Sequence, residues 1–528
     1  MNLTGLHLIG GTWCADCPEQ FSAKDAATGE PLSTPFAEAN EKDVDQAMRL
    51  AEESFDALQA APREQIAVLL DTIAAGIESA DESLLERTHS ETGLPMQRLQ
   101  MERARTVGQT RRFAQLVREG SWVQARIDRG NPGRQPMPKP DVRAMLTGIG
   151  PVAVFGASNF PLAISVAGTD TISAFAARCP VVVKGHPGHP GTCEWITELI
   201  AKSISQVGLP MGMFSMLQGA GHEVGMALVR HPLTQAVAFT GSLRGGRALF
   251  NEAANRPNPI PVYAEMGSIN PVFVLPDALK SRSPQIARDY VQSVTLGTGQ
   301  FCTNPGLLFV PTGPEGDQFV EQVGSEAASV PPAPMLHEGI LERYQAGVTR
   351  MAAMEGVKRI GPAPTNDTRQ AQCVIFEANA ALFEQHQTLS EEVFGPASLV
   401  LRCEGVEQMV EIARHLQGQL TASIHGEPNE LAAHTNLIHQ LQRHVGRLVF
   451  NGFPTGIEVC AAMHHGGPYP ATTHCGFTSI GDAAILRFTR PICYQNLPDN
   501  ALPVELQNHN ASGIWRLVDG EFSREDVK

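Results

Sequence analysis

The chain has 528 residues, of which 42% are hydrophobic and 18% charged, and its formal net charge is -15. This length exceeds what one hydrophobic core supports and predicts two or three domains. The acidic balance argues against non-specific binding to a nucleic-acid backbone. The N-terminus lacks a basic leader with an apolar run, and no segment reaches the roughly 18 apolar residues of a membrane span. We therefore expect a cytoplasmic protein with neither a membrane nor a nucleic acid as partner.

The first regular pattern along the chain is helical. From residue 42 to residue 118, apolar side chains such as Val44 and Ala47 recur at helical spacing. Between residues 119 and 142 this pattern gives way to short apolar runs and to Gly- and Pro-rich turns at residues 130–140. These predict strands and a loop that project from the body, an arm of the kind that often serves oligomerisation.

Strand and helix patterns then alternate from residue 151 to residue 265, which predicts a doubly wound parallel sheet. The carboxyl edge of such a sheet is where a ligand binds. A Gly-x-Gly-x-x-Gly fingerprint is missing at the first strand-to-helix turn, which counts against an ordinary Rossmann enzyme. The expected strands are 151–155, 179–184, 213–217, 236–240 and 261–265, and the expected helices are about 162–177, 192–207, 224–229 and one after 241–246.

A glycine-rich turn follows the expected strand 236–240. Gly241, Ser242 and Gly246 stand at the start of a helix, where backbone amides and the helix dipole can receive a pyrophosphate. This pattern is weak in isolation, because many strand-to-helix turns of this kind are only tight turns.

The cysteines and histidines give no metal-site pattern. Ten cysteines are scattered along the chain, so we expect reduced thiols and no disulfide framework. Cys14 and Cys17 form the one close pair, and no second pair completes a zinc site. His464 and His465 lie in Gly- and Pro-rich sequence without a carboxylate at helical spacing. We interpret both pairs as incidental and predict that no metal is bound.

Two segments carry residues suited to aldehyde chemistry. Glu265 lies in Ala-Glu-Met-Gly-Ser-Ile-Asn-Pro (264–271), and Cys302 lies in Gly-Gln-Phe-Cys-Thr-Asn (299–304). A thiol can attack an aldehyde carbon, and a carboxylate can activate the water that hydrolyses the resulting thioester. The structural alternative for Cys302 is a small buried side chain. Asn159, which precedes the helix expected near residue 161, could likewise be only a helix cap.

Six motifs occur in order along the chain: Phe-Gly-Ala-Ser-Asn-Phe-Pro (155–161), Val-Val-Lys (182–184), Phe-Thr-Gly-Ser (239–242), the Glu265 and Cys302 segments, and Glu-Val-Phe-Gly-Pro (392–396). This order resembles the aldehyde dehydrogenase superfamily over nearly the whole chain. The resemblance implies an α/β fold with two doubly wound domains and a β oligomerisation arm. Segments 184–190, 263–271 and 490–495 look like the α-ketoglutaric semialdehyde (2,5-dioxovalerate) dehydrogenase branch.

The resemblance implies three catalytic roles. Cys302 would add to the aldehyde to give a thiohemiacetal and then a thioester, while Asn159 and the Cys302 backbone amide hold the oxyanion. Glu265 would activate the water that releases the carboxylate product. For these tasks we expect the pKa of Cys302 to be lowered and the pKa of Glu265 to be raised.

The resemblance also implies a cofactor site. Many NAD-preferring relatives have a glutamate three residues after the lysine of this site, where the present chain has Pro187, with His186 beside the lysine. Loss of that negative charge predicts that NADP is preferred and NAD also used. The alternative is that Pro187 only shapes the loop. The implied contacts are Lys184 with a ribose, Gly241, Ser242 and Gly246 with the pyrophosphate, and Glu392 and Phe394 with the nicotinamide ribose and ring.

The substrate is the less specific part of the prediction. A semialdehyde with a distal carboxylate requires a cation at the pocket mouth, and Arg111 or Arg112 could bind that carboxylate bidentately. The alternative is that each is a solvated or interface arginine. Phe160, Phe301 and Phe453 would instead suit the uncharged tunnel of a fatty or medium-chain aldehyde dehydrogenase, which is the alternative activity.

A catalytically silent relative and a CoA-acylating relative are the remaining classes. Intact catalytic residues argue against the first, and Glu265, which acylating enzymes typically lack, argues against the second. We expect a cofactor domain of residues 1–118 and 146–266, a catalytic domain of residues 267–488, and an arm and tail of residues 119–145 and 489–528. The partners implied are a small-molecule aldehyde and further copies of the chain, as a homodimer or homotetramer.

Overall fold

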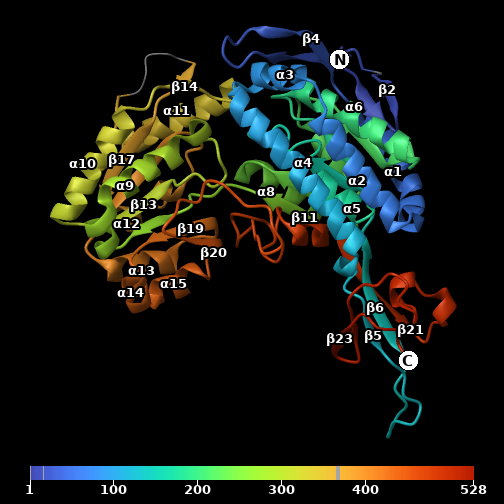
Figure 1. The fold of residues 1–528 in the computed structure, drawn as a ribbon. Helices are drawn as coiled ribbons and strands as arrows, with labels where there is room; N and C mark the ends of the chain where they lie inside the picture. Colours follow the sequence, from blue (N-terminus) through green and yellow to red (C-terminus); the bar gives the residue numbers. More distant parts are fainter. Residues whose placement is uncertain (1, 16, 364–368) are drawn as a thin grey trace.

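The computed structural model describes residues 2–15, 17–363 and 369–528. It contains two seven-stranded sheets with helices packed on them, and a five-stranded sheet that projects from the body (Figure 1). Within these ranges no helix combines the length and the apolar character that a bilayer crossing requires. No disulfide joins the cysteines of the described residues.

The helical opening section is confirmed. Helix α1 starts at a capping box formed by Asn40 and Asp43, and α3 and α4 end at Gly93 and Gly120, both in the left-handed conformation. The buried side chains of α2 recur at helical spacing and pack against α4 and α6. The helices are α1 (Glu41–Ala60), α2 (Arg63–Glu78), α3 (Glu82–Thr92) and α4 (Met96–Glu119).

The predicted doubly wound sheet is also confirmed. Its five parallel strands have the order β11 (Val262–Glu265), β10 (Ala236–Thr240), β7 (Val152–Phe155), β8 (Val181–Lys184) and β9 (Phe214–Leu217), followed by antiparallel β1 (His7–Ile9) and β2 (Thr12–Cys14). Its helices are α5 (Thr169–Ala176), α6 (Pro190–Val207), α7 (Glu223–Arg230) and α8 (Leu243–Ala254). The paired register brings Phe155, Lys184, Thr240 and Glu265 to one edge.

One expected helix is shorter than the sequence predicts. The pattern predicts a helix from about residue 162, but α5 begins only at Thr169. The carbonyl of Ile164 accepts a hydrogen bond from the amide of Ala157 at 2.8 Å, and the amide of Gly168 bonds to Ser165 instead. A helix through this segment would need the Ile164 carbonyl for Gly168, so the buried residues before α5 form turns.

The second sheet has six parallel strands and one short antiparallel edge strand. Their order is β15 (Lys358–Arg359), β17 (Val374–Asn379), β18 (Ala397–Cys403), β13 (Leu307–Pro311), β12 (Val272–Val274), β19 (Gln419–His425) and β20 (Val445–Phe450). Its helices are α9 (Pro276–Thr295), α10 (Pro314–Ala328), α11 (Glu338–Ala352), α12 (Ala380–Gln385), α13 (Val406–His415), α14 (Pro428–Ala433) and α15 (Thr435–Leu441). Two antiparallel strand pairs complete the body, β3 (Gln20–Lys24) with β4 (Pro31–Ala37) and β14 (Ala333–Pro334) with β16 (Gln370–Ala371).

The projecting sheet combines segments that lie far apart in the sequence. Its order is β21 (Thr489–Gln495), β6 (Val142–Gly148), β5 (Arg126–Asp128), β22 (Arg516–Val518) and β23 (Glu521–Ser523). The C-terminus lies at this arm, beside the loop between β5 and β6 (Figure 1). Pairing of subunits through the arm stays a prediction.

A long segment after β20 returns from the second sheet to the first. We call residues 464–480 the crossing segment. The amide of Met266 donates to Ala471 at 2.8 Å, and the amide of Thr473 donates to Ala264 at 3.0 Å. Farther on, the buried Arg487 guanidinium contacts the buried Asp170 carboxylate on α5 at 2.7 Å. These contacts hold the crossing segment against the end of β11.

Candidate active site

The loop that carries Cys302 is clamped to its surroundings. It follows α9 and a short 3₁₀ helix, Leu296–Gly299. The Asn270 amide group donates to the carbonyls of Cys302 at 2.8 Å and Asn304 at 2.9 Å, and Asn304 in turn donates to Gly395 at 2.9 Å. Gly299 has φ +66°, and a Cβ there would lie 2.3 Å from the Gly395 backbone. Only glycine fits this close approach.

Glu265 and Cys302 meet at a buried histidine from the crossing segment. His465 Nε2 lies 2.9 Å from Glu265 Oε1 and 3.5 Å from Cys302 Sγ. The other carboxylate oxygen of Glu265 accepts a hydrogen bond from the Ser479 hydroxyl. The exposed fractions are 4% for Glu265 and 1% for His465. His465 therefore links Glu265 and Cys302, the two residues that the sequence predicted to be catalytic.

The pKa shifts of Cys302 and Glu265 are both opposite to those expected from the sequence. Burial raises the pKa of the Cys302 thiol well above its ordinary value, and the neighbouring Glu265 charge raises it further. Burial would also raise the pKa of Glu265, but His465 and Ser479 stabilise its carboxylate and hold that pKa below the ordinary value. The resting cluster thus pairs a protonated thiol with an ionised carboxylate, the reverse of the prediction from sequence.

Asn159 lies beside the same loop. The side-chain amide of Asn159 donates to the backbone carbonyl of Gln300 at 2.9 Å, and the backbone carbonyl of Asn159 accepts from Arg98 at 2.7 Å. The alternative role as a helix cap does not apply, because α5 begins at Thr169 after Gly168. One side-chain N–H serves Gln300, which leaves the second for an oxyanion next to Cys302.

Sequence reasoning missed His465 and Ser479. The interpretation of the histidine pair as incidental is wrong for His465, which makes its contacts across 163 and 200 sequence positions. No local pattern signals such a contact. Glu265, Cys302 and His465 offer atoms within 4.8 Å of one another and are also metal-ligand types. The expectation that no metal is bound stays a prediction.

The lysine expected at a ribose lies at the carboxyl end of β8. Lys184 donates to the carbonyl of Gly219, and burial lowers its pKa to about 8. His186 Nδ1 accepts a hydrogen bond from the Gly188 amide at 3.0 Å, and burial lowers its pKa well below the ordinary value. His186 is therefore a neutral ring whose second nitrogen can donate, next to the half-buried Pro187.

The glycine turn expected at a pyrophosphate begins α8, whose first turn is exposed. The Gly241 amide is bonded to the Glu265 carbonyl at 3.0 Å, and Ser242 caps the helix by accepting from Gly245 at 3.2 Å. A Cβ at Gly246 would lie 2.7 Å from Met266, so this glycine allows the helix to pack on the strand. The exposed first-turn amides of the helix, not those of Gly241 and Gly246, fit a pyrophosphate.

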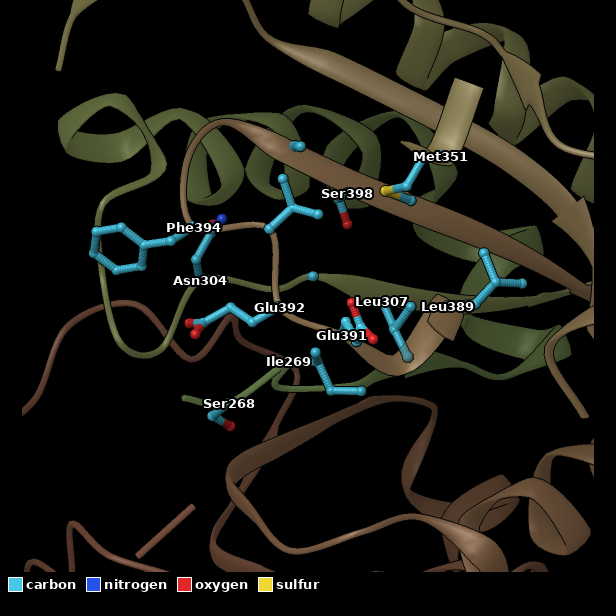
Figure 2. Close-up of a pocket in the computed structure, with 13 residues that line it drawn as sticks. Ser268, Ile269, Asn304, Leu307, Met351, Leu389, Glu391, Glu392, Phe394 and Ser398 are labelled. Carbon is cyan, nitrogen blue, oxygen red and sulfur yellow. The ribbon is translucent and has the colours of Figure 1, made fainter. Parts of the chain in front are cut away.

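Glu392 and Phe394 line a pocket at the second sheet, together with Ser268 and Ile269, which follow the last strand of the first sheet. The Glu392 and Phe394 side chains extend toward the same end of it, away from Leu389 and Met351 (Figure 2). Burial raises the pKa of Glu392 to about 8, although a hydrogen bond from the Ser268 backbone lowers it. Together with Lys184 and the start of α8, this set of donors and acceptors fits a dinucleotide.

The structure separates the proposed substrate residues. Arg111 pairs with Glu78 on the surface, and Arg112 pairs with Asp482, so neither guanidinium is available for a carboxylate. The Phe453 ring lies tilted against the His425 ring, with 4.6 Å between the ring centres, and packs against a core cluster of the second domain. The expectations for Arg111 and Arg112 are wrong, and the expected tunnel role of Phe453 stays a prediction.

Phe160 and Phe301 do meet. Their rings are 5.4 Å apart and nearly perpendicular, beside Asn159 and Cys302 in sequence. They form an apolar wall next to the thiol.

Residues 13–469 match the model of the aldehyde dehydrogenase family. The chain belongs to the aldehyde dehydrogenase family. It is 47% identical to α-ketoglutaric semialdehyde dehydrogenase 2 of Azospirillum brasilense, over 99% of this chain and 100% of that protein. Identity to α-ketoglutaric semialdehyde dehydrogenase of Acinetobacter baylyi is 45%, over 98% and 99% of the two chains. The predicted family resemblance is confirmed, and the chain is an oxidoreductase that acts on aldehydes.

The fold agrees with solved structures. NADP-dependent glyceraldehyde-3-phosphate dehydrogenase of Bacillus halodurans, solved with NADP, superposes with a TM-score of 0.81 at 19% identity and covers 94% of this chain and 99% of its own. Aldehyde dehydrogenases with this fold have been solved with NAD as well as with NADP. The predicted aldehyde dehydrogenase fold is therefore confirmed, and the family's cofactor is NAD or NADP.

The raised pKa of Cys302 predicts how the free enzyme reacts with iodoacetamide. Because the thiolate is the reacting form, alkylation of Cys302 should keep rising with pH past the ordinary thiol value of 9.0. In Glu265→Gln the rise should move to lower pH, because a nearby negative charge is removed. Peptide mass spectrometry would follow Cys302, with the exposed Cys475 as the accessibility control. A plateau below pH 9.0, or an unmoved profile in the variant, would contradict this assignment.

Proposed function

We propose that this enzyme oxidises α-ketoglutaric semialdehyde to α-ketoglutarate, with NADP as the preferred cofactor and NAD as a second one. The observation that carries the substrate is the 47% identity, over 99% of the chain, to a relative of that name. The Cys302, Glu265 and His465 cluster supports the reaction type, because it unites a nucleophile with an ionised base in a buried site.

Attack on the aldehyde begins with a proton transfer. The Cys302 thiol is protonated at rest, and Glu265 is the ionised group within reach, with His465 bridging the two. As the sulfur–carbon bond forms, the thiol proton passes to Glu265. The aldehyde oxygen becomes an oxyanion that the Asn159 side chain and the Cys302 backbone amide stabilise.

The thiohemiacetal then becomes a thioester. A nicotinamide held in this site would supply the acceptor for the hydride that leaves the substrate carbon as the carbonyl re-forms. Glu392 and Phe394 would hold the nicotinamide ribose and ring, Lys184 would hold a ribose, and the start of α8 would hold the pyrophosphate. With a dinucleotide held by these groups, water would be kept away from the carbon during hydride transfer.

Hydrolysis returns the site to its resting state. Glu265, once it has released the thiol proton, takes a proton from a water molecule, and the water oxygen attacks the thioester carbon. The carbon–sulfur bond breaks, the carboxylate product leaves, and the sulfur is reprotonated. His465 and Ser479 keep Glu265 ionised, so the base is available at neutral pH.

The substrate proposal predicts a clear rate order. Initial rates of reduced-cofactor formation should give a much higher kcat/KM for α-ketoglutaric semialdehyde than for decanal, with α-ketoglutarate as the product by chromatography. A preference for decanal would instead support the fatty aldehyde activity. An acyl-CoA product, or no turnover with either aldehyde, would contradict the proposed reaction.

NADP preference is supported by the loop after Lys184. Pro187 places no carboxylate where one would repel a 2′-phosphate, and the neutral His186 keeps one ring nitrogen as a donor. Glu38 is the acidic group that acts on Lys184 electrostatically, and its carboxylate already accepts the Ala220 amide at 2.8 Å. The Ala220 amide occupies one oxygen of Glu38, so the other oxygen can accept from a ribose hydroxyl, which is consistent with use of NAD as well.

Substitution at Pro187 tests the origin of this preference. Pro187→Glu should lower kcat/KM for NADP by at least about tenfold and leave that for NAD nearly unchanged, since a like charge at a phosphate costs more than about 1.4 kcal/mol. Pro187→Gln is the matched control that changes the loop without the charge. Equal effects of the two variants on NADP would show that loop shape, not charge, sets the preference.

A further inference from the structure

One face of α4 carries three ionisable side chains beside the cysteine loop. Arg98, Glu102 and Arg105 follow one another at positions i, i+4 and i+7 and so share one face of the helix. The guanidinium carbons of Arg98 and Arg105 lie 4.9 and 5.2 Å from the centre of the Phe160 ring. This face lies beside the wall formed by Phe160 and Phe301.

Two of these three side chains have structural partners. Arg98 donates to the Asn159 carbonyl at 2.7 Å and lies 3.9 Å from the Glu102 carboxylate. Glu102 accepts the amides of Leu162 and Ala163 at 2.8 and 3.0 Å. Arg98 and Glu102 therefore hold the turn that carries Asn159 and Phe160. The second carboxylate oxygen of Glu102 is buried without a hydrogen-bond partner among the described residues, and burial raises the pKa of Glu102.

Arg105 differs from both. Its Nε and Nη2 atoms are buried and have no hydrogen-bond partner among residues 2–15, 17–363 and 369–528. Buried donors without a partner are costly, and a charged group costs more than a neutral one. Nε and Nη2 form one edge of the guanidinium, with two parallel N–H groups that match the two oxygens of a carboxylate.

The position of Arg105 suits a group carried by the substrate. Its charge reaches Cys302, where it lowers the thiol pKa, against the stronger raising effects of burial and Glu265. Arg447 also interacts with Cys302, but two of its guanidinium nitrogens already donate to the carbonyls of Gly456 and Pro454. Arg105 is thus the cation near the thiol with a whole edge left open in the described part of the chain.

We propose that Arg105 binds the distal carboxylate of the substrate through Nε and Nη2 and so selects aldehydes that carry an acid group. This inference rests on the proposed function, whose substrate has such a carboxylate. The Phe160 and Phe301 rings then contact the carbon chain between the carboxylate and the aldehyde.

Three aldehydes of equal chain length test the assignment. They are 2,5-dioxopentanoate (α-ketoglutaric semialdehyde), 5-oxopentanoate and pentanal, of which only the last has no carboxylate. Arg105→Gln should lower kcat/KM for the two acids by about 10- to 100-fold, mainly through KM, because a charge-assisted hydrogen-bond pair is lost. The value for pentanal should stay within about threefold. Arg105→Lys should restore part of the loss, since it keeps the charge without the paired geometry.

Arg111→Gln is the matched control, because Arg111 lies on the same helix and pairs with Glu78 on the surface. It should leave all three rates unchanged. Thermal unfolding of each variant separates misfolding from loss of binding, and Arg105→Lys replaces Arg105→Gln if the latter does not fold. Equal losses for pentanal and the acids, or no loss for the acids, would overturn the role of Arg105. A wild-type enzyme that prefers decanal to 2,5-dioxopentanoate would instead overturn the proposed substrate, and the response of 5-oxopentanoate to Arg105→Gln would still decide the role of Arg105.

Discussion

The active site depends on the hydrogen bond between Glu265 and His465. Glu265 ends the edge strand of the first sheet, and His465 arrives on a segment that has just left the second sheet. Both side chains are almost fully buried, so neither can lose its partner without leaving a polar group unsatisfied. The pairing of residues 471–473 with β11 keeps this contact in place. The chemistry at the cysteine loop therefore depends on how the crossing segment packs against the end of the first sheet.

This contact also sets the electrostatic state of the site. Burial favours the neutral forms of Cys302 and Glu392, and both have a raised pKa. Glu265 is the exception, because His465 and Ser479 stabilise its charge. A protonated thiol next to an ionised carboxylate is a poor nucleophile at rest. It reacts when the sulfur bonds to an aldehyde carbon while its proton passes to the carboxylate. The charge of Arg105 lies near the same sulfur, so binding of an acidic aldehyde would change the field at the nucleophile as well as orient the chain.

The sequence predicts those parts of this protein that local patterns and motif order determine. The alternating pattern predicted the five parallel strands of the first sheet to within one or two residues, but not its antiparallel strands β1 and β2. The order of the Asn159, Glu265 and Cys302 motifs identified the family. The sequence could not show which arginine is unpaired, because Arg105, Arg111 and Arg112 share one helix and differ only in partners such as Glu78 and Asp482. It could not reveal His465 either, since a contact across 200 positions has no local signature. The expected pKa directions failed because they depend on burial and on neighbours distant in sequence: His465 and Ser479 lower the pKa of Glu265, and burial and Glu265 raise the pKa of Cys302.

The most direct test is the pH dependence of thioester hydrolysis in His465→Phe, measured by rapid quench and by the mass of the Cys302 adduct. Without His465, burial should raise the pKa of Glu265, so the base is protonated over a wider range. The acidic limb of the hydrolysis rate should then move to higher pH, with a burst of reduced cofactor and an acyl-enzyme that accumulates at neutral pH. His465→Gln, which retains a donor, should shift the limb less. A limb at the wild-type pH in His465→Phe, without acyl-enzyme, would contradict the central role of this contact.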